Sequence, residues 1–516
     1  MCGILLTLQS DASDFTDRLK TLTVRGPDES HIVMGDDYII GHNRLCITNP
    51  MEGKQPIVRG DWIVVHNGEI YNAPALTHAK SDSYFIMDQI EKAKDPKTVP
   101  ILLDGIFAFC AYNTETGQFI CARDPVGVIP LYWSLYEGRL WVASEMKALH
   151  GHAVQIVPPG YVLDENGNLE CYKVEYPQVL PNKKHVHKTM VRLMSDAIVK
   201  RLHLDVPWAM LLSGGLDSAI IATLIDDNIE ESNVKWKSMH TFSIGLKGSP
   251  DLYNAREMAH FLPCVEHHEV TFTVEEGIAA LRDCIYAIES YDVTTVRASV
   301  PMYLLGKHIK KCGIKVVFSG EGSDELFGGY LYNRFCPSRE EMHAECVTKM
   351  ERLHYHDCLR ANKSMACHGI ECRVPFLDKA VVNYAMRTLD PSEKMTVPTK
   401  KLLRDDFKDF LPKTLATRVK EQFSDGVGDR WIEGLKEHAE LTYTEDRDTW
   451  HKRFPFQTPQ TREAFMYRSI FSELFGSCGE ETVYYSDDTC ACSSERGLRW
   501  SKNLKRDPSA KQIIDL

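Results

Sequence analysis

One stretch of eight residues constrains this chain more than any other, Leu211-Leu212-Ser213-Gly214-Gly215-Leu216-Asp217-Ser218. A short apolar run, 208–212, leads into it and a second one, 219–225, follows it. This order predicts a strand buried on both faces, a tight turn and a helix. Because glycine has no Cβ, Gly214 and Gly215 let a ligand approach the backbone, while the N–H groups that open the helix point towards it. The stretch therefore predicts an anion site, and phosphate is the anion we expect.

The chemistry of this loop differs from that of the common nucleotide-binding loops. It is neither G-x-x-x-x-G-K-[ST] nor G-x-G-x-x-G, and it carries Ser213, Ser218 and the carboxylate of Asp217 in place of a lysine. A carboxylate suits a magnesium ion rather than the phosphate itself. The alternative is a plain Gly-Gly turn with Asp217 or Ser218 as an ordinary helix N-cap. These eight residues alone leave both interpretations open.

Length and charge limit what the whole chain can be. With 516 residues it is too long for a single core and predicts two to four domains. Its formal net charge of −12 argues against binding to nucleic acid or to an anionic membrane surface. No apolar run approaches the roughly 20 residues that span a bilayer, and the first residues lack the pattern of a signal peptide. A role with small molecules is favoured.

The cysteines and histidines predict neither disulfides nor a metal cluster. The 16 cysteines are scattered without a C-x-x-C pair, so we expect reduced thiols in a cytoplasmic protein. The pairs His185/His187 and His267/His268 are not supported as metal sites by a cluster of ligands in the sequence, and we expect them to be surface or packing residues.

The first third of the chain is rich in short strand-like segments separated by turn residues, which predicts a β-rich layered domain with few helices. The segments are 38–40, 62–65, 106–112, 119–122 and 140–143. Cys2 is a possible nucleophile, because removal of Met1 would leave its thiol beside a free α-amine with a pKa near 8. For a lone cysteine, however, the start of a buried strand is the favoured explanation. Asn67-Gly68 alone would predict a hairpin turn.

Five short motifs occur in a fixed order before and between these segments. They are Met1-Cys2-Gly3-Ile4, Arg25-Gly26-Pro27-Asp28, Asn43-Arg44-Leu45, Asn67-Gly68-Glu69-Ile70-Tyr71-Asn72 and Arg123-Asp124-Pro125-Val126-Gly127. Their order and spacing resemble the glutaminase domain of the class II, N-terminal-nucleophile amidotransferases. The resemblance implies a layered αββα domain that hydrolyses glutamine.

The resemblance also implies roles for individual residues. Cys2 would be the nucleophile, and the Asn67 side chain and Gly68 N–H would form the oxyanion hole, a type of donor commonly worth about 3 kcal/mol. Glutamine recognition needs a cation for the carboxylate and anions for the ammonium. The implied glutamine-binding residues are Arg44, Leu45, Cys46, Ile47, Thr48, Asn67, Gly68, Glu69 and Asp82.

The chain departs from the family pattern in three places. Val24 stands where the family usually has histidine, and Cys46 where it usually has serine. The connection from Asn72 to Ser81 is short, and Ser83-Tyr84 follows Asp82 where an acidic residue is expected. The register of Asp82 is the assignment that these departures affect most.

Beyond a proline-bearing connector at 176–182, strands and helices alternate. We expect helices at 190–202 and 255–262, and strands at 208–212, 239–246 and 315–318. This alternation predicts a doubly wound parallel sheet whose loops gather at the carboxyl ends of the strands. A second loop, Ser319-Gly320-Glu321-Gly322-Ser323-Asp324-Glu325, would then face the loop that follows Leu212. This coincidence favours the phosphate-site interpretation of the first loop.

The two loops together resemble those of the PP-loop ATP pyrophosphatases, which cleave ATP between the α and β phosphates. Four further segments resemble the glutamine-hydrolysing asparagine synthetases, and with them the resemblance extends to about residue 475. These segments are 248–252, 291–299, 373–378 and 420–428.

This second resemblance implies the residues of a synthetase site. ATP would contact Leu211, Ser213, Gly214, Gly215, Leu216, Asp217, Ser218, Ile244, Ser319 and Gly320. Mg²⁺ would bind Asp217 and Asp324, since hard oxygen donors on facing loops can bracket a metal–phosphate. Aspartate or its adenylate would contact Thr294, Arg297, Asp378 and Lys420, and Glu321 would assist the chemistry as an acid or base.

The resulting expectation is a cytoplasmic two-domain enzyme that makes asparagine from aspartate, ATP and glutamine-derived ammonia through β-aspartyl-AMP. The expected divisions are residues 2–180, residues 181–478 and a loosely ordered polar tail at 479–516. The family suggests a homodimer. Two alternatives stay open: a related ligase acting on another carboxylate, such as a β-lactam synthetase-like enzyme, and a catalytically inactive glutamine-binding regulator.

Overall fold

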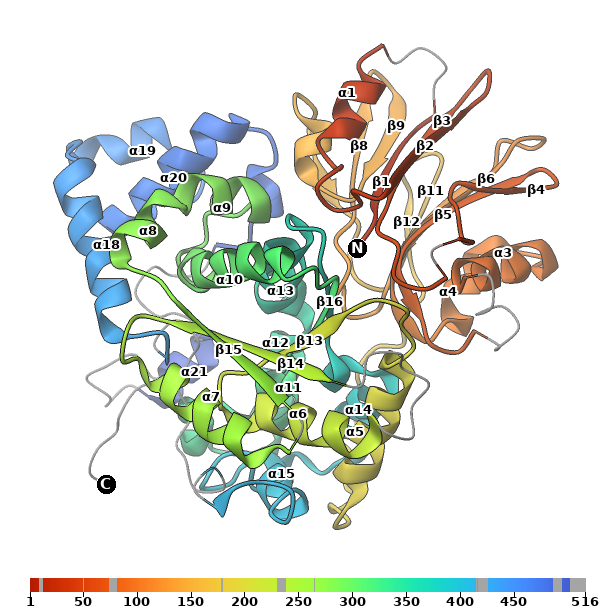
Figure 1. The fold of residues 1–516 in the computed structure, drawn as a ribbon. Coiled ribbons are helices and arrows are strands. Elements are labelled where there is room, and N and C mark those ends of the chain that lie inside the picture. Colours follow the sequence, from red (N-terminus) through yellow and green to blue (C-terminus); the bar gives the residue numbers. More distant parts are fainter. Residues whose placement is uncertain are drawn as a thin grey trace.

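The computed structural model describes residues 1–8, 13–49, 51–73, 81–177, 180–229, 238–263, 265–413, 415, 426–485 and 494–501. The chain folds into an N-terminal part built on two antiparallel sheets and a C-terminal part built on one parallel sheet (Figure 1).

Each N-terminal sheet has six strands. The first has the order β10 (Gln155–Ile156), β8 (Tyr132–Tyr136), β9 (Arg139–Ala143), β1 (Gly3–Thr7), β3 (Ile39–Arg44) and β2 (Glu29–Met34). The second has the order β12 (Leu169–Cys171), β11 (Tyr161–Asp164), β7 (Phe119–Arg123), β6 (Gly105–Asn113), β5 (Trp62–Ile70) and β4 (Ile57–Arg59). Four of the five expected strand segments fall within β5, β6, β7 and β9, and the fifth, 38–40, overlaps the start of β3.

Helices cover the outer faces of both sheets. The helix α1 (Phe15–Lys20) lies on the first sheet, and α3 (Ser83–Lys92) and α4 (Val99–Leu102) lie on the second (Figure 1). Alternation along β6 explains this layering, because Phe107, Phe109 and Ala111 belong to the core under α3. The intervening Ile106 and Ala108 belong to the main core, which includes the other sheet. The expected αββα arrangement is confirmed.

Asn67 and Gly68 do not form a hairpin turn. Both lie inside β5, where they pair with Ala108 and Phe107 of β6. Gly68 has φ +128°, and a Cβ there would lie 2.0 Å from the carbonyl oxygen of Ile106. Long-range strand pairing thus overrides the local turn signal of Asn-Gly.

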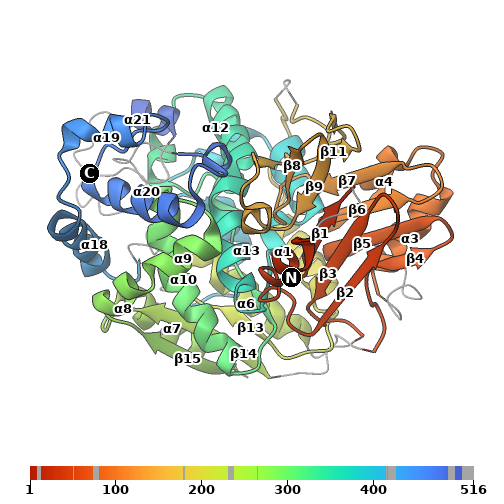
Figure 2. The same ribbon diagram turned by 90° about the horizontal axis from the view of Figure 1, so that it is seen from above.

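The C-terminal sheet is parallel, with the order β15 (Val265–Thr271), β14 (Met239–Gly245), β13 (Trp208–Leu211), β16 (Val316–Phe318) and β17 (Glu371–Arg373). Helices α5 (Thr189–Arg201), α6 (Leu216–Ile229) and α7 (Pro250–Phe261) cover one face, and α10 (Val293–Lys311) and α13 (Asp357–Ala366) the other (Figures 1 and 2). The strand order reverses between β13 and β16, which confirms the doubly wound prediction and places the loops after these two strands side by side.

Further helices surround this sheet. In Figures 1 and 2 one group stands beside α10, formed by α8 (Val274–Ala279), α9 (Leu281–Ile288), α18 (Asp429–Thr442), α19 (Trp450–Arg453) and α20 (Arg462–Phe475). The other helices are α11 (Ser323–Phe327), α12 (Arg339–Arg352), α14 (Lys379–Asn383), α15 (Lys401–Asp406) and α21 (Glu495–Trp500). In the part of the chain that the structure describes, no helix combines the length and apolarity needed to cross a bilayer.

Within the expected tail, the described residues 494–501 are packed rather than loose. Ser494, the N-cap of α21, donates its hydroxyl to Glu345 Oε2 at 2.7 Å. Gly497 is buried, and a Cβ there would lie 2.9 Å from the ring of Tyr332. Few apolar residues are needed for this docking because one glycine allows close approach, which explains why composition predicted disorder here.

Candidate active sites

A cavity of about 220 Å³ opens at the carboxyl ends of β13 and β16. It is lined by most of the residues predicted for the synthetase site: Leu211, Ser213, Gly215, Leu216, Asp217, Ser218, Ile244, Thr294, Ser319, Gly320, Glu321 and Asp324. The two acid-bearing loops therefore face one space, as the parallel topology predicts. This is where an adenylate-forming site would lie.

A lysine that sequence reasoning missed lies between the two predicted metal ligands. Lys400 Nζ lies 2.7 Å from Asp217 Oδ2 and 2.6 Å from Asp324 Oδ1, and its side chain is 4% exposed. Ser323 also donates its hydroxyl to Asp217 Oδ1 at 2.8 Å. The adjacent Lys401 instead points outward to Asp405. Nothing in the local sequence distinguishes these two lysines; only the tertiary fold does.

The two aspartates have the arrangement that a shared cation requires. Their carboxylates come from loops after different strands and converge on one positively charged atom, the ammonium nitrogen of Lys400. Oxygen donors in this arrangement fit a hard divalent ion such as Mg²⁺ held together with a phosphate. The fold therefore brings together donors that fit the predicted metal.

Glu321 lies in the same cavity, held by a second group that sequence reasoning missed. Its Oε2 lies 2.7 Å from Arg360 Nη2, and Arg360 also pairs with Asp357 at 2.9 Å. Burial raises the pKa of Glu321, and the Arg360 guanidinium partly opposes that rise. A carboxylate with a raised pKa is a suitable group for moving a proton near neutral pH.

Among the described residues, three that were predicted for this site do not line the cavity: Gly214, Arg297 and Asp378. Gly214 lies at the bend with φ +69°, where a Cβ would meet the backbone of Asn254 at 2.3 Å. Arg297 forms a buried ion pair with Glu463, which lies on α20.

Asp378 also has partners outside the cavity, because it is the N-cap of α14 and its Oδ2 lies 2.8 Å from Arg201 Nη1. Lys420 lies outside the described residues. The aspartate contacts expected of Arg297, Asp378 and Lys420 stay predictions.

A second, smaller cavity in the N-terminal part collects most of the predicted glutamine-site residues. It is lined by Cys2, Arg44, Leu45, Ile47, Thr48, Gly68, Glu69 and Asp82, together with Gly53, Gln55, His66, Ser81, Ser83 and Glu371. Glu371 belongs to β17, so the C-terminal part contributes to this cavity. Sequence reasoning missed this contribution because the two segments are far apart in the chain.

Cys2 and Asn67, the predicted nucleophile and oxyanion donor, are in direct contact. The Cys2 N–H donates to Asn67 Oδ1 at 2.8 Å. Within the described part of the chain, the buried Asn67 Nδ2 has no hydrogen-bond acceptor. Because an unsatisfied buried donor is costly, this amide is available to a developing oxyanion. Burial raises the pKa of the Cys2 thiol, so the nucleophile needs a base.

The charged groups predicted to hold glutamine already have protein partners. Arg44 Nη1 lies 3.1 Å from Glu29 Oε2, and Glu69 Oε1 lies 2.7 Å from Arg373 Nη2. Burial raises the pKa of Glu69 well above its usual range, against the effect of Arg373. Asp82 accepts the Ile70 N–H at 2.8 Å, which fixes its place in the cavity despite the short preceding connection.

The three departures from the family pattern have different consequences. Val24 is 44% exposed and lies outside the cavity. Cys46 also does not line it; its N–H donates to Asp28 Oδ2 at 2.7 Å, and burial raises the pKa of its thiol to about 11. Ser83 does line it and accepts or donates a hydrogen bond with His66 Nδ1 at 2.9 Å.

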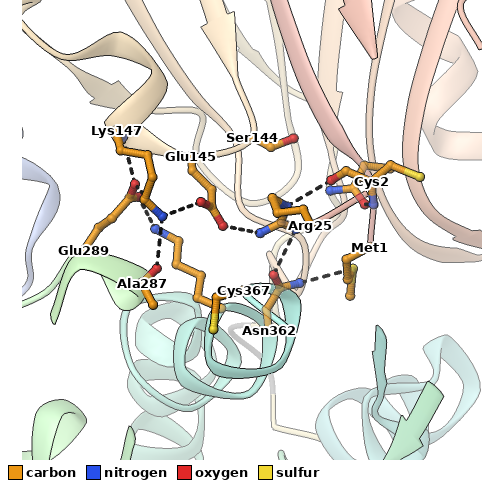
Figure 3. Close-up of polar contacts among 12 residues, drawn as sticks. Met1, Cys2, Arg25, Ser144, Glu145, Lys147, Ala287, Glu289, Asn362 and Cys367 are labelled. Carbon is orange, nitrogen blue, oxygen red and sulfur yellow. Dashed lines mark hydrogen bonds and ion pairs between the residues drawn. The ribbon is translucent and has the colours of Figure 1, made fainter. Parts of the chain in front are cut away.

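Arg25 joins Cys2 to the C-terminal part (Figure 3). Its Nε donates to the Cys2 carbonyl oxygen at 2.9 Å, its Nη1 to Glu145 Oε1 at 2.5 Å and its Nη2 to Asn362 Oδ1 at 3.2 Å. Asn362 lies on α13, the same helix whose Arg360 contacts Glu321. One ten-residue helix therefore contacts both candidate sites.

A buried ionic network extends from Arg25 across the boundary between the two parts (Figure 3). Lys147 Nζ lies 2.5 Å from Glu145 Oε2 and 3.5 Å from Glu289 Oε1, and Lys363 also pairs with Glu289. None of these side chains is more than 4% exposed. Three cations and two carboxylates thus share the interface.

Comparison with known proteins covers the whole chain. The family model for a glutamine amidotransferase domain matches residues 1–201. The family model for asparagine synthase matches residues 190–340 and 334–493. Asparagine synthetase [glutamine-hydrolyzing] 3 of Arabidopsis thaliana is 41% identical, aligned over 100% of this chain and 95% of its own length. Asparagine synthetase B [glutamine-hydrolyzing] of Escherichia coli is 40% identical over 99% of both. Together with the two cavities, these matches show that the chain belongs to the glutamine-hydrolysing asparagine synthetase family.

Proposed function

We propose that this chain makes L-asparagine from L-aspartate with ammonia released from glutamine, through β-aspartyl-AMP. Glutamine-dependent asparagine synthesis is the activity of its family, and the intermediate and residue roles below are the finer part of the proposal. The observation that carries it is the pairing of a Cys2 cavity with a Ser-Gly-loop cavity in one chain.

In the glutaminase step, the Cys2 thiol attacks the side-chain amide of glutamine. Removal of Met1 frees the Cys2 α-amine to take the thiol proton. The developing oxyanion is held by Asn67 Nδ2 and the Gly68 N–H, and collapse releases ammonia and leaves a thioester that water hydrolyses to glutamate. Arg44 binds the α-carboxylate of glutamine, and Glu69 and Asp82 bind its α-ammonium. When glutamine binds, these three side chains replace contacts with the protein by contacts with the substrate.

In the synthetase step, the β-carboxylate of aspartate attacks the α-phosphorus of ATP and displaces pyrophosphate. The loop from Ser213 to Ser218 holds the phosphates with its N–H groups, and Lys400 neutralises charge beside them. Mg²⁺ held by Asp217 and Asp324 would neutralise the pyrophosphate leaving group. Ammonia then attacks the activated carbonyl, Glu321 accepts a proton, and AMP leaves.

The two steps must be linked inside the protein, because free ammonia is protonated in water and diffuses away. The junction around Glu145 and Asn362 separates the two cavities and is where a route would run. The route, the bound Mg²⁺, a homodimeric assembly and a cytoplasmic location stay predictions.

The test is product analysis with purified protein, glutamine, aspartate and Mg-ATP. We expect asparagine, glutamate, AMP and pyrophosphate in equal amounts. Glutamate without asparagine, or an amide of another carboxylate in competition assays, would favour the related-ligase alternative. No turnover of either substrate, with glutamine still bound, would favour a non-catalytic regulator.

The variant Cys2→Ala separates the two half-reactions. It should abolish glutamine use and leave asparagine synthesis from added ammonium intact, because the synthetase cavity is built from other residues. Cys312→Ala, which removes an exposed thiol, is the matched control. Loss of both activities in Cys2→Ala alone would contradict the assigned division of labour.

A further inference from the structure

Three potential metal ligands meet at the edge of the parallel sheet, outside both cavities. In the register of β14 and β15, His240 stands opposite Glu266 and Phe242 opposite His268. Because alternate residues share one face of a sheet, His240, Glu266 and His268 project from the same face. One ligand atom from each lies within 4.8 Å of the others.

The distances match those of a tetrahedral site. His240 Nδ1 and His268 Nε2 lie 3.1 Å apart, at hydrogen-bond distance. Glu266 Oε2 lies 3.6 Å from His240 Nδ1, and Glu266 Oε1 lies 3.4 Å from His268 Nε2. Ligands about 2.0–2.1 Å from zinc at tetrahedral angles are about 3.3 Å apart. Two imidazoles and one carboxylate are also a donor set that zinc and similar ions take, with water completing the fourth position.

The surroundings hold these side chains in place and leave them accessible. The ring of His268 stacks on Phe242 with centroids 4.4 Å apart, and Phe242 in turn contacts His308 of α10. The side chains of His240, Glu266 and His268 are 32%, 61% and 24% exposed, so an ion can enter from solvent.

We propose that His240, Glu266 and His268 bind one divalent transition-metal ion of the zinc class, which fastens the edge strand β15 to β14. The site differs from the predicted Mg²⁺ site in its nitrogen donors. It departs from the expectation that the His267/His268 pair are surface or packing residues. His267 forms hydrogen bonds with Thr241 and Ser243 on the opposite face of the sheet. His268 is the next residue along the strand, so its side chain lies on the other face, towards His240.

A metal ion at this site would affect the synthetase cavity, because residues of β14 also line that cavity. Phe242, Ser243 and Ile244 line that cavity, and β15 is the strand that supports them at the edge of the sheet. An ion on the outer part of the two strands therefore stabilises the wall of the nucleotide site without touching it.

The test is titration of the full chain with Co²⁺ and Zn²⁺ in excess Mg²⁺, which occupies oxygen-only sites. We expect one equivalent of Co²⁺ to give visible bands without the near-ultraviolet charge-transfer band of a cobalt–thiolate bond. Calorimetry with Zn²⁺ should show at least tenfold weaker binding in His240→Gln and His268→Gln, and a smaller loss in Glu266→Gln. Zn²⁺ should raise the Tm of the wild type and not of the histidine variants.

His451→Gln, which removes one exposed imidazole on α19, is the matched control and should bind like the wild type. Glu266→Gln changes a largely exposed side chain, so it reports on binding even if a histidine variant folds poorly. Equal Zn²⁺ affinity in all four variants, a cobalt–thiolate spectrum, or no binding at micromolar metal would each overturn the proposal.

Discussion

At the scale of single residues, the ammonium of Lys400 has the largest predicted consequence. It lies between the carboxylates of Asp217 and Asp324, which would otherwise repel each other and the phosphates of ATP. Its neighbour Lys401 is half exposed and pairs only with Asp405 among the described residues. One position in the chain separates a buried functional charge from a solvated one.

This difference gives a matched pair of variants. Lys400→Met should lower both glutamine- and ammonium-dependent asparagine synthesis at least about 100-fold, because a preorganised charge at the phosphates is lost. Glutamine hydrolysis without ATP should persist. Lys401→Met should leave all three rates close to those of the wild type, as expected for an exposed ion pair. The rates are measured from asparagine and glutamate production; equal losses in both variants would contradict the assignment.

Met1 supplies a second prediction at this scale. Met1 is 1% exposed, and its amino group lies 3.6 Å from Glu371 Oε2, so the uncleaved residue fits the junction. While Met1 remains, the Cys2 nitrogen is a peptide N–H and cannot take the thiol proton. Chain made with methionine aminopeptidase inhibited should hydrolyse glutamine at least about 100-fold more slowly.

Intact mass identifies the two forms of the chain, and synthesis from ammonium should be the same in both. Equal glutaminase rates would show that the α-amine of Cys2 is not the base.

At the scale of elements, α13 links the two sites. Asn362 accepts from Arg25, which holds the Cys2 carbonyl, and Arg360 holds Glu321 two residues earlier on the helix. A displacement of α13 would therefore move groups in both cavities. Small misplacements of a reacting group cost large factors in rate.

The variant Asn362→Ala tests this link. Removing the side chain leaves Arg25 with one fewer acceptor, so the Cys2 backbone is less well held. We expect glutaminase kcat to fall about tenfold, with ammonium-dependent synthesis within twofold of the wild type. Asn362→Asp, which keeps an acceptor oxygen for Arg25, should restore most of the rate.

Asn383→Ala removes an exposed asparagine from α14 and is the control. Equal glutaminase rates in Asn362→Ala and wild type would remove Asn362 from the set of positioning residues.

At the scale of the whole molecule, the two parts are joined by buried charge. Among the described residues, Arg25, Lys147 and Lys363 form ion pairs with two carboxylates, Glu145 and Glu289, so this network holds one cation in excess. Burial lowers the pKa of Lys363 to about 8, although Glu289 and Glu145 favour its charged form. Burial of an excess charge has this effect because the neutral amine is easier to desolvate.

The sign of the resulting pH dependence follows from linkage. Between about pH 8 and the usual lysine pKa near 10.4, Lys363 binds a proton more readily in the unfolded chain than in the folded one. The contribution of Lys363 to folding free energy therefore becomes more favourable as the pH rises through this window, by up to about 3 kcal/mol.

The Tm of the wild type minus that of Lys363→Met should thus increase from pH 7.5 to pH 10. Lys349→Met is the matched control, because Lys349 lies on α12 outside the buried network. A pH-independent difference between wild type and Lys363→Met would contradict the assigned pKa shift.

The sequence alone determined the parts of this protein whose signals are local. Apolar runs ending at Ser213 and Ser319 predicted parallel strands, and parallel strands place the loops at their carboxyl ends together. The motifs around Cys2, Asn67 and Glu321 predicted two chemistries in one chain. The short strand-like segments predicted a β-rich layered domain, and the resemblance to the amidotransferases implied its αββα order.

Only the tertiary structure decided which side chains meet across large separations in the chain. It placed Asn67-Gly68 in a strand, because pairing with β6 outweighs the turn preference of two residues. It selected Lys400 over Lys401, brought Glu371 of β17 to the Cys2 cavity, and joined His240 to His268 across two strands. It directed Arg297 and Asp378 to Glu463 and Arg201, away from the cavity. Charges and ligands act through distance in space, and no single stretch of sequence contains that distance.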